Sequence, residues 1–199
     1  DALPICEREG ENLHVLRLPC RRARIDRSNY VEMLSFVASA ARALPRIARE
    51  LRADGLIVFF SLPCGPLGWL VRKRVGVPYV VSLRGGDVPG AEARVSTLHR
   101  VLAPLRRAVL RRARAVVANS QGLAQLSDAI DPISVRVIPN GVDTGFFCPT
   151  SDPRGDAGEI RFLFAGRFQP QKNLFVLLDQ FASAAAQSSQ RLHMTLIGD

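Results

Sequence analysis

Short runs of β-branched and aliphatic residues recur along the chain, and longer stretches with apolar residues at helical spacing lie between several of them. Seven runs predict strands, at 14–19, 56–61, 79–85, 115–120, 136–141, 161–166 and 194–199. Most runs are continuously apolar, which is typical of strands covered on both faces. Helical spacing predicts helices at about 29–53, 66–75, 94–113, 121–129 and 172–188. This alternation predicts an α/β fold with a mostly parallel sheet and right-handed crossovers.

The composition changes over residues 147–158, where prolines, glycines and small polar residues replace the periodic pattern. This stretch predicts a first Rossmann-like domain at 1–147, a linker at 148–158 and the start of a second domain at 159–199. One strand–helix–strand unit follows the linker. Because such a unit cannot bury both faces of its own strands, we expect the second domain to be incomplete.

Composition narrows the class of protein. Hydrophobic residues make up 47% of the 199 residues, enough for a proper core, which excludes global disorder. The longest uncharged stretch, 56–71, contains Pro63 and Pro66, so we expect no transmembrane span. The four cysteines lack metal-ligand or redox-motif spacing, which predicts reduced thiols and a cytoplasmic protein. His14, His99 and His193 are isolated, so a zinc site has little support.

A net charge of +9 predicts a surface that attracts phosphate, nucleic acid or anionic lipid. Residues 100–114 hold six arginines and predict an amphipathic basic helix. The arginines of one narrow arc are Arg100, Arg107, Arg111 and Arg114, and the opposing apolar stripe is Val101, Leu105, Val109 and Ala113. This helix is either a solvated face, a contact for anionic lipid head groups or a nucleic-acid surface. Nucleic acid ranks lowest, because the sequence offers no obvious aromatic stacking platform.

The loops that follow parallel strands form the ligand crevice in such folds. In AGRFQPQKN, Gly166 lets the backbone approach a ligand, while Arg167 and Lys172 at the expected start of the next helix could grip a diphosphate. The alternative is a pair of solvated loop charges. Walker and dinucleotide-binding glycine patterns are both absent from the sequence, which disfavours P-loop and classical dinucleotide chemistry.

Two further strand exits carry polar residues. LRGGDVPG could bring Asp87 and backbone amides to a hydroxyl-bearing substrate, although a tight turn organised by the aspartate is the simpler interpretation. In ANSQG, either Asn119 or Ser120 can cap the helix that begins near Gln121, and capping is the favoured interpretation.

The order of these loops carries a family resemblance. AVVANS, RVIPNGVDTGFF, RFLFAGRFQPQKNLFVLLDQFA and MTLIGD, in that order, resemble the middle of a retaining glycosyltransferase of family 4, which has the two-Rossmann GT-B architecture. The similarity runs over about 55–199. It implies a nucleoside-diphosphate sugar donor bound between two domains, transfer with retention, and no obligatory metal or cofactor.

The resemblance also implies roles for particular residues. Gly166 opens the donor loop, and Arg167 and Lys172 match the basic pair that neutralises the departing diphosphate. These two cations would therefore be catalytic without exchanging protons. Arg84 stands where many members carry a histidine near the acceptor and donor sugar, with Gly85 beside it and Asp87 in the acidic place. This departure puts in doubt any histidine chemistry at that loop.

The family's glycine-rich first loop and its paired glutamates are absent, so we expect a fragment of a longer enzyme that is inactive alone. The implied acceptor is a glycan or lipid-linked precursor, with the basic helix at 100–114 steering the protein to the inner face of the membrane. The unpaired sheet edge after the last strand makes a homodimer a further hypothesis. Two alternatives stay open: a non-catalytic scaffold of the same fold, and a GT-B relative that epimerises or hydrolyses a nucleotide sugar.

Overall fold

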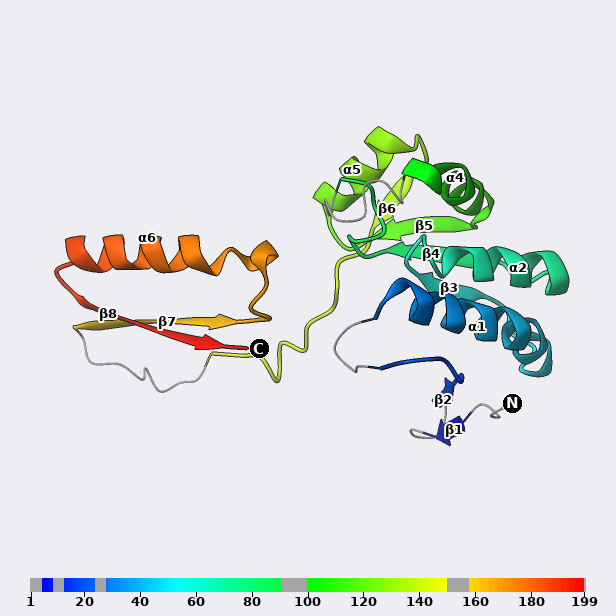
Figure 1. The fold of residues 1–199 in the computed structure, drawn as a ribbon, viewed down its shortest axis with the longest axis horizontal. Helices are drawn as coiled ribbons and strands as arrows, with labels where there is room; N and C mark the ends of the chain where they lie inside the picture. The colour runs from blue at the N-terminus through cyan, green and yellow to red at the C-terminus, as the bar shows by residue number, and fades with distance from the viewer. Residues whose placement is uncertain (1–4, 9–12, 24–27, 91–99, 150–157, 199) are drawn as a thin grey trace. The chain divides into compact units, whose positions relative to one another are not determined.

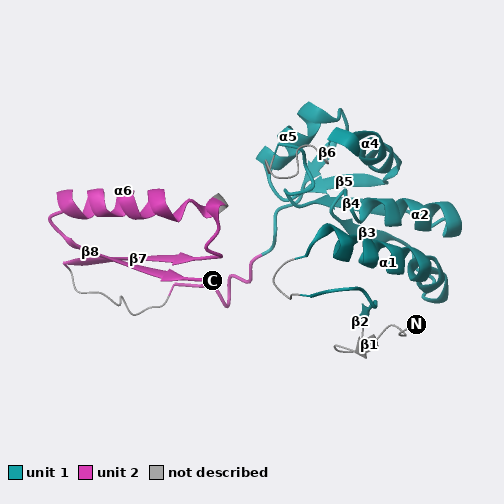
Figure 2. Ribbon diagram, in the orientation of Figure 1, with its two compact units in different colours: residues 1–141 teal, residues 142–199 magenta. Residues whose placement is uncertain are grey.

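The computed structural model describes residues 5–8, 13–23, 28–90, 100–149 and 158–198. The chain divides into two compact units, unit 1 at residues 1–141 and unit 2 at residues 142–199 (Figure 2). Most of the predicted linker, residues 150–157, lies outside the described residues, as do residues 94–99 of one predicted helix. The predicted domain boundaries therefore stay predictions.

Unit 1 contains a parallel sheet whose strand order follows the chain (Figure 1). Its strands are β3 (Leu56–Phe59), β4 (Tyr79–Leu83), β5 (Ala115–Ala118) and β6 (Val135–Val137). The described helices of the unit are α1 (Tyr30–Glu50), α2 (Gly65–Val75), α4 (Ala103–Arg112) and α5 (Gln121–Ile130). Helix α2 packs on β3 and β4 and lies beside α1 and α4, while α5 packs on β5 and β6. This is the α/β, mostly parallel architecture that the sequence predicts.

An antiparallel pair, β1 (Ile5–Arg8) and β2 (His14–Arg17), precedes this sheet. Only β2 was expected from the sequence. Strand β1 has the sequence ICER, in which charged residues interrupt the apolar pattern that signals a strand. Helix α1 begins with a capping box, in which Asn29 accepts the N–H of Glu32 and the Glu32 carboxylate accepts the N–H of Asn29.

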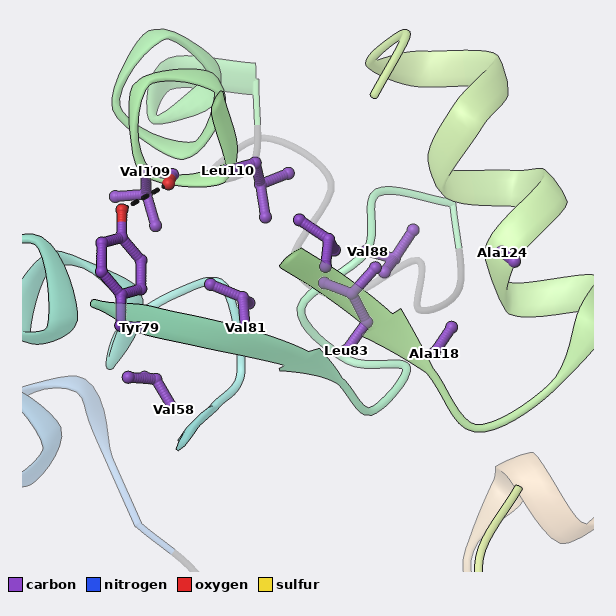
Figure 3. Packing of buried hydrophobic residues seen from close by; sticks show 10 residues of the cluster. Val58, Tyr79, Val81, Leu83, Val88, Val109, Leu110, Ala118 and Ala124 are labelled. Atoms are coloured by element: carbon purple, nitrogen blue, oxygen red, sulfur yellow. Dashed lines mark hydrogen bonds between the residues drawn. The ribbon is translucent and has the colours of Figure 1, made fainter. Parts of the chain in front are cut away.

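The core of unit 1 lies between the sheet and the helices α2, α4 and α5 (Figure 3). Val81 and Leu83 of β4 are fully buried, and Val109 of α4 packs in the same cluster. The buried Tyr79 hydroxyl donates a hydrogen bond of 2.6 Å to the Val109 carbonyl, and burial raises the pKa of Tyr79 to about 12. Gly68 allows this packing, because a Cβ there would lie 2.8 Å from the Tyr79 ring.

The expectation that the strands are covered on both faces is correct for β4 and wrong for β3. Val58 is buried on the side of α2, whereas Ile57 and Phe59 on the opposite face are 67% and 48% exposed. The continuous apolar run of β3 therefore does not mean two-sided burial. It leaves the aromatic side chain of Phe59 partly exposed at the carboxyl end of the strand.

Unit 2 is a single strand–helix–strand arrangement. The strands β7 (Glu159–Ala165) and β8 (Arg191–Ile197) pair in parallel, and between them lie a short 3₁₀ turn, η2 (Pro170–Lys172), and α6 (Leu174–Gln187). Large apolar side chains stay exposed, including Leu163 at 67% and Phe175 at 84%. In the described parts of both units, no helix combines the length and apolar character needed to cross a bilayer.

Candidate functional site

The carboxyl ends of the parallel strands in unit 1 meet at one edge of the sheet. Leu83 of β4, Ala118 of β5 and Val137 of β6 lie in register, so the residues that follow them leave the sheet side by side. Ligands of open α/β sheets bind at this edge, where loops and helix N-termini converge. The first candidate site is therefore built from these exits.

Asp87 organises the turn after β4. The side chain is 1% exposed, and its carboxylate accepts the backbone N–H groups of Arg84, Gly85 and Ser61, the first two at 2.9 and 3.2 Å. The Ser61 hydroxyl also donates to the Asp87 carbonyl at 2.9 Å. The fold thus uses the carboxylate to join the exits of β3 and β4, which favours the tight-turn interpretation of LRGGDVPG.

The loop after β3 has a strained start. Phe60 has a φ of 72°, in the left-handed region that residues with a Cβ rarely adopt, and its N–H donates to the Ser82 carbonyl. Burial raises the pKa of the nearby Cys64 thiol, and the charge of Asp87 adds to the rise. A pocket of about 300 Å³ opens beside this loop, with Met33, Phe36, Phe60 and Pro63 in its lining.

Arg84 crosses the carboxyl edge of the sheet. Its guanidinium lies 4.5 Å from the centre of the Phe59 ring, and Nη1 donates a 2.6 Å hydrogen bond to Oδ1 of Asn140. Because β5 lies between β4 and β6, this side chain reaches past the β5 exit to the loop after β6. Its Nε is buried, and no atom of the described part of the chain accepts a hydrogen bond from it. Among the described residues, none forms an ion pair with Arg84.

The space next to Arg84 is open. Gly85 has a φ of 115°, and a Cβ placed there would meet no atom of the described residues within 4 Å. The following strand exit carries Ser120, whose side chain accepts the Leu123 N–H and caps α5. The prediction of a cap in ANSQG is thus confirmed, with Ser120 as the capping residue. The structure brings Arg84, Gly85 and Asp87 together in one turn.

The amphipathic pattern predicted for the basic segment at 100–114 is correct only in part. The four arginines of the predicted arc are exposed, and Val109 of the apolar stripe is buried. Helix α4 ends at Arg112, and Arg106 is fully buried on it, whereas Val101 and Leu105 are 71% and 36% exposed. Arg106 lies three and four residues before Val109 and Leu110, which are also buried. An arginine therefore takes a place on the face that packs against the rest of unit 1.

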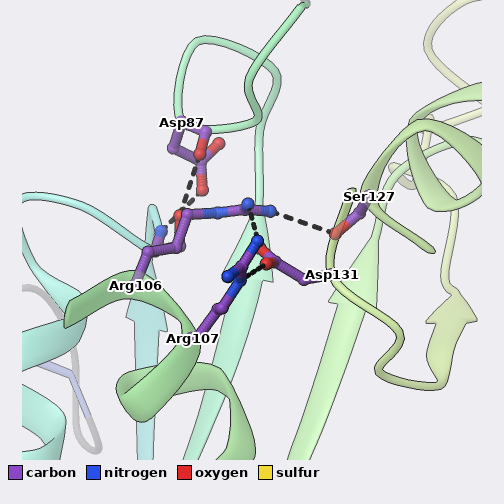
Figure 4. Close-up of polar contacts among 6 residues, drawn as sticks. Asp87, Arg106, Arg107, Ser127 and Asp131 are labelled. Carbon is purple, nitrogen blue, oxygen red and sulfur yellow. Dashed lines mark hydrogen bonds and ion pairs between the residues drawn. The ribbon is translucent and has the colours of Figure 1, made fainter. Parts of the chain in front are cut away.

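A counter-ion makes the burial of Arg106 tolerable. Its guanidinium forms an ion pair with the buried Asp131 and donates to the Ser127 hydroxyl, and the half-exposed Arg107 binds the same carboxylate (Figure 4). Desolvation lowers the pKa of Arg106, while Asp131 and Asp87 oppose that shift. No local sequence signal marks this pair, since its members are 25 residues apart.

Other arginines surround a hollow at the opposite edge of the sheet. A pocket of about 450 Å³ is lined by Arg72 from α2, by Arg111 from α4 and by Arg114 just before β5. All three are exposed. Beside it, the Arg112 guanidinium stacks 4.7 Å from the centre of the Trp69 ring. The positive charge of this segment thus gathers at the ends of α2 and α4.

The second candidate site is the loop after β7 in unit 2. Gly166 lies opposite Gly198, where a Cβ would fall 1.9 Å from the Gly166 carbonyl oxygen, so the two strand ends approach closely. Arg167 and Lys172 are both exposed on this loop. Lys172 ends η2, two residues before α6 begins, rather than starting the helix itself. Within unit 2, the structure therefore places both predicted cations in one loop at a strand carboxyl end.

The sequence of this chain is similar to those of known proteins. The sequence profile of the glycosyl transferase 4-like domain matches residues 2–141, which is nearly all of unit 1. The chain belongs to this glycosyl transferase 4-like family. The family resemblance expected from the sequence is therefore confirmed, as is the α/β class that it implies. The match covers Arg84, Gly85 and Asp87, whereas the Arg167–Lys172 loop lies beyond it.

Curated relatives support the same family. The D-inositol 3-phosphate glycosyltransferase of Segniliparus rotundus is 33% identical over 171 residues, covering 76% of this chain and 36% of the relative. The enzyme of the same name from Salinispora tropica is 33% identical over 191 residues, covering 80% and 36%. A third, from Actinosynnema mirum, is 34% identical over 139 residues, covering 57% and 30%. This glycosyl transferase 4-like chain thus spans about a third of the relatives' length.

Proposed function

We propose that the complete gene product containing this chain transfers a sugar from a nucleoside-diphosphate sugar to an acceptor, with retention of anomeric configuration. The observation that carries the proposal is the Arg167–Lys172 loop at the carboxyl end of β7, in a chain of the glycosyl transferase 4-like family. The relatives' shared name, D-inositol 3-phosphate glycosyltransferase, supports sugar transfer as the reaction type.

The proposed chemistry needs cations where negative charge develops. As the glycosidic bond breaks, charge grows on the leaving diphosphate, and a guanidinium and an ammonium beside it stabilise the transition state more than the ground state. Arg167 supplies the planar fork and Lys172 the mobile point charge. In this mechanism neither residue transfers a proton, and the reaction uses no metal or organic cofactor.

Unit 1 would hold the acceptor. Its candidate residues are Arg84 and Gly85 at the open exit of β4, with Asp87 fixing the turn that presents them. A catalytic role for Asp87 remains a weaker hypothesis, because three backbone N–H groups already occupy its carboxylate.

Product analysis tests the proposal. The complete gene product is incubated with a panel of nucleoside-diphosphate sugars and polyol, glycan and lipid-linked acceptors, and the anomeric configuration of any product is read by NMR. We expect a retained glycoside, and an Arg167→Ala variant with kcat/KM lowered about 10- to 100-fold, the scale of a hydrogen bond to a charged group. Arg191→Ala, which removes an exposed arginine from the opposite end of β8, is the matched control.

The outcome separates the alternatives. An epimerised sugar or a free sugar, with no glycoside, would favour the GT-B epimerase or hydrolase. Nucleotide-sugar binding without any product would favour the non-catalytic scaffold. Equal kcat/KM for Arg167→Ala and Arg191→Ala would remove Arg167 from the donor site.

We also propose that the protein works at the inner face of a membrane, on a lipid-linked or glycan precursor. The arginine-lined hollow of Arg72, Arg111 and Arg114 supports contact with anionic head groups. Cosedimentation with vesicles should require anionic lipid and fall as salt rises. Equal binding to neutral vesicles would contradict this part of the proposal. A homodimer stays a separate prediction for light scattering.

A further inference from the structure

Arg84 carries a charge that the described fold leaves without a counter-ion. The guanidinium is stacked on Phe59 and bonded to a neutral amide, that of Asn140, and its Nε is buried without a partner. The nearest acidic residue in sequence, Asp87, directs its carboxylate to the backbone of the same turn instead. A partly buried guanidinium is normally paired with a carboxylate of the protein. Where the fold supplies none, an anion from outside can take that place.

The surroundings of Arg84 are suited to an anion. Arg84 lies where the parallel strands end, with open space at Gly85 and with the exposed Asn140 on its far side. Stacking on Phe59 holds the guanidinium plane in place, so that the Nη1 and Nη2 N–H groups not bonded to Asn140 are pre-organised for the oxygens of an anion. Such geometry is typical of a phosphate or carboxylate site.

We propose that Arg84 is a specificity-determining residue that binds a phosphate or carboxylate group of the acceptor. This inference rests on the proposed transferase function. The diphosphate of the proposed donor has its own cations, Arg167 and Lys172, in unit 2. The anion that Arg84 binds therefore belongs to the other substrate, and the acceptor is an acidic molecule such as a sugar or polyol phosphate or an acidic sugar.

A purely structural role for Arg84 makes a different prediction. If Arg84 only tied the β4 exit to the loop after β6, a stronger bond to position 140 would leave function intact. Asn140→Asp makes this distinction, because it keeps the acceptor oxygen and adds a negative charge. The new carboxylate would pair with Arg84 and compete with any external anion, while the contact that joins the two loops is preserved.

The experiment measures binding of sodium phosphate, and separately of sodium acetate, to the complete gene product by calorimetry. It uses an Arg167→Ala, Lys172→Ala background, so that the donor loop does not bind phosphate. We expect Arg84→Gln and Asn140→Asp each to weaken phosphate binding about 10-fold or more, the scale of losing a hydrogen bond to a charged group. The control is Arg42→Gln, which removes an exposed arginine of α1 that donates a hydrogen bond to the Ala38 carbonyl of its own helix.

The binding measurements identify the anion and test the role of Arg84. Phosphate binding without acetate binding identifies a phosphate group, and binding of both anions extends the site to carboxylates. Phosphate bound equally well by the background protein and Arg84→Gln overturns the inference, as does no binding of either anion to the background protein. If Arg84→Gln does not fold, Asn140→Asp decides alone, and unchanged phosphate binding there is the contrary result.

The two proposals fail separately. Unchanged phosphate binding in Arg84→Gln leaves the donor loop and the proposed sugar transfer untouched. If the gene product makes no glycoside but Arg84→Gln loses phosphate, the transferase proposal fails and an anion site at the sheet edge still stands.

Discussion

Arg84 and Arg106 solve the same physical problem in opposite ways. Both are drawn into unit 1, and both leave Nε buried without a hydrogen-bond partner. Arg106 is fully buried and has the carboxylate of Asp131, whereas Arg84 has an aromatic face and an amide oxygen. An arginine whose charge is paired with a carboxylate of the protein stabilises the fold, whereas an arginine without such a partner can bind an anionic ligand. The position of Arg84 at the carboxyl edge of the sheet agrees with that distinction.

The largest effect should follow from removing the counter-ion of Arg106. Asp131→Ala leaves a fully buried guanidinium unpaired, and we expect the free energy of unfolding to fall by about 3 to 5 kcal/mol. Urea denaturation measures this loss. Arg107→Gln, which removes the half-exposed partner of the same carboxylate, should cost about 1 kcal/mol or less. Equal losses in the two variants would contradict a structural role for the buried pair.

Tyr79 extends the comparison of the two arginines to a neutral side chain. It is buried as an uncharged hydrogen-bond donor and needs no counter-ion. Its pKa is raised to about 12, so this stabilising contribution is complete below pH 10 and is lost as pH rises through 12. The loss should approach about 2 to 3 kcal/mol, from 1.36 kcal/mol per pKa unit. Urea denaturation between pH 9 and about 12 measures the slope.

Tyr79→Phe is the control for that slope. This variant should be about 1 kcal/mol less stable at neutral pH, because it loses one hydrogen bond. The Val109 carbonyl still accepts the Ala113 N–H, so no buried acceptor is orphaned. An alkaline slope as steep as that of the parent protein would show that other groups cause the decline.

Asp87→Asn should have a smaller effect. One carboxylate oxygen accepts the N–H groups of Arg84 and Gly85, and the other accepts that of Ser61. The amide keeps one acceptor oxygen and turns its N–H₂ toward the N–H donors on the other side, so we expect a loss of about 1 to 3 kcal/mol. Thermal or urea unfolding measures the loss. Ser61→Ala removes only the hydrogen bond to the Asp87 carbonyl, so its loss of unfolding free energy should lie at the lower end of this range. A fully stable Asp87→Asn would revive the interpretation of Asp87 as a substrate-facing acid.

The smallest stability change should come from Arg84. Arg84→Met keeps the apolar stem against Phe59 and leaves no unpaired carboxylate behind, so unfolding free energy should change by less than about 1 kcal/mol. Urea denaturation of Arg84→Met and Asp131→Ala side by side compares the two losses of unfolding free energy directly. A loss of several kcal/mol in Arg84→Met would mean that Arg84, like Arg106, is needed by the fold.

Local sequence pattern was enough for most of the elements and for the loops at their ends, although it missed β1, in which charged residues interrupt the apolar run. The apolar runs located β3 to β8, and the glycine and cation spacing located the loop that holds Arg167 and Lys172. The two side-chain pairs, Arg106–Asp131 and Arg84–Asn140, could not be predicted from local sequence. Arg106 meets Asp131 across 25 residues and Arg84 meets Asn140 across 56, and no periodicity connects positions that only the sheet brings together.

The helical periodicity at 100–114 misled for a related reason. It assumed that apolar residues face inward and arginines outward, which holds for most amphipathic helices. A buried arginine breaks that rule when a distant carboxylate compensates its charge, and Arg106 does so while Val101 faces solvent.

The most direct test of the whole account is a crystal structure of the complete gene product with a nucleoside diphosphate. We predict that the Arg167 guanidinium and the Lys172 ammonium both lie within hydrogen-bond distance of the diphosphate oxygens, at the carboxyl end of β7. A bound nucleotide with both side chains turned away from its phosphates would contradict the proposed transferase.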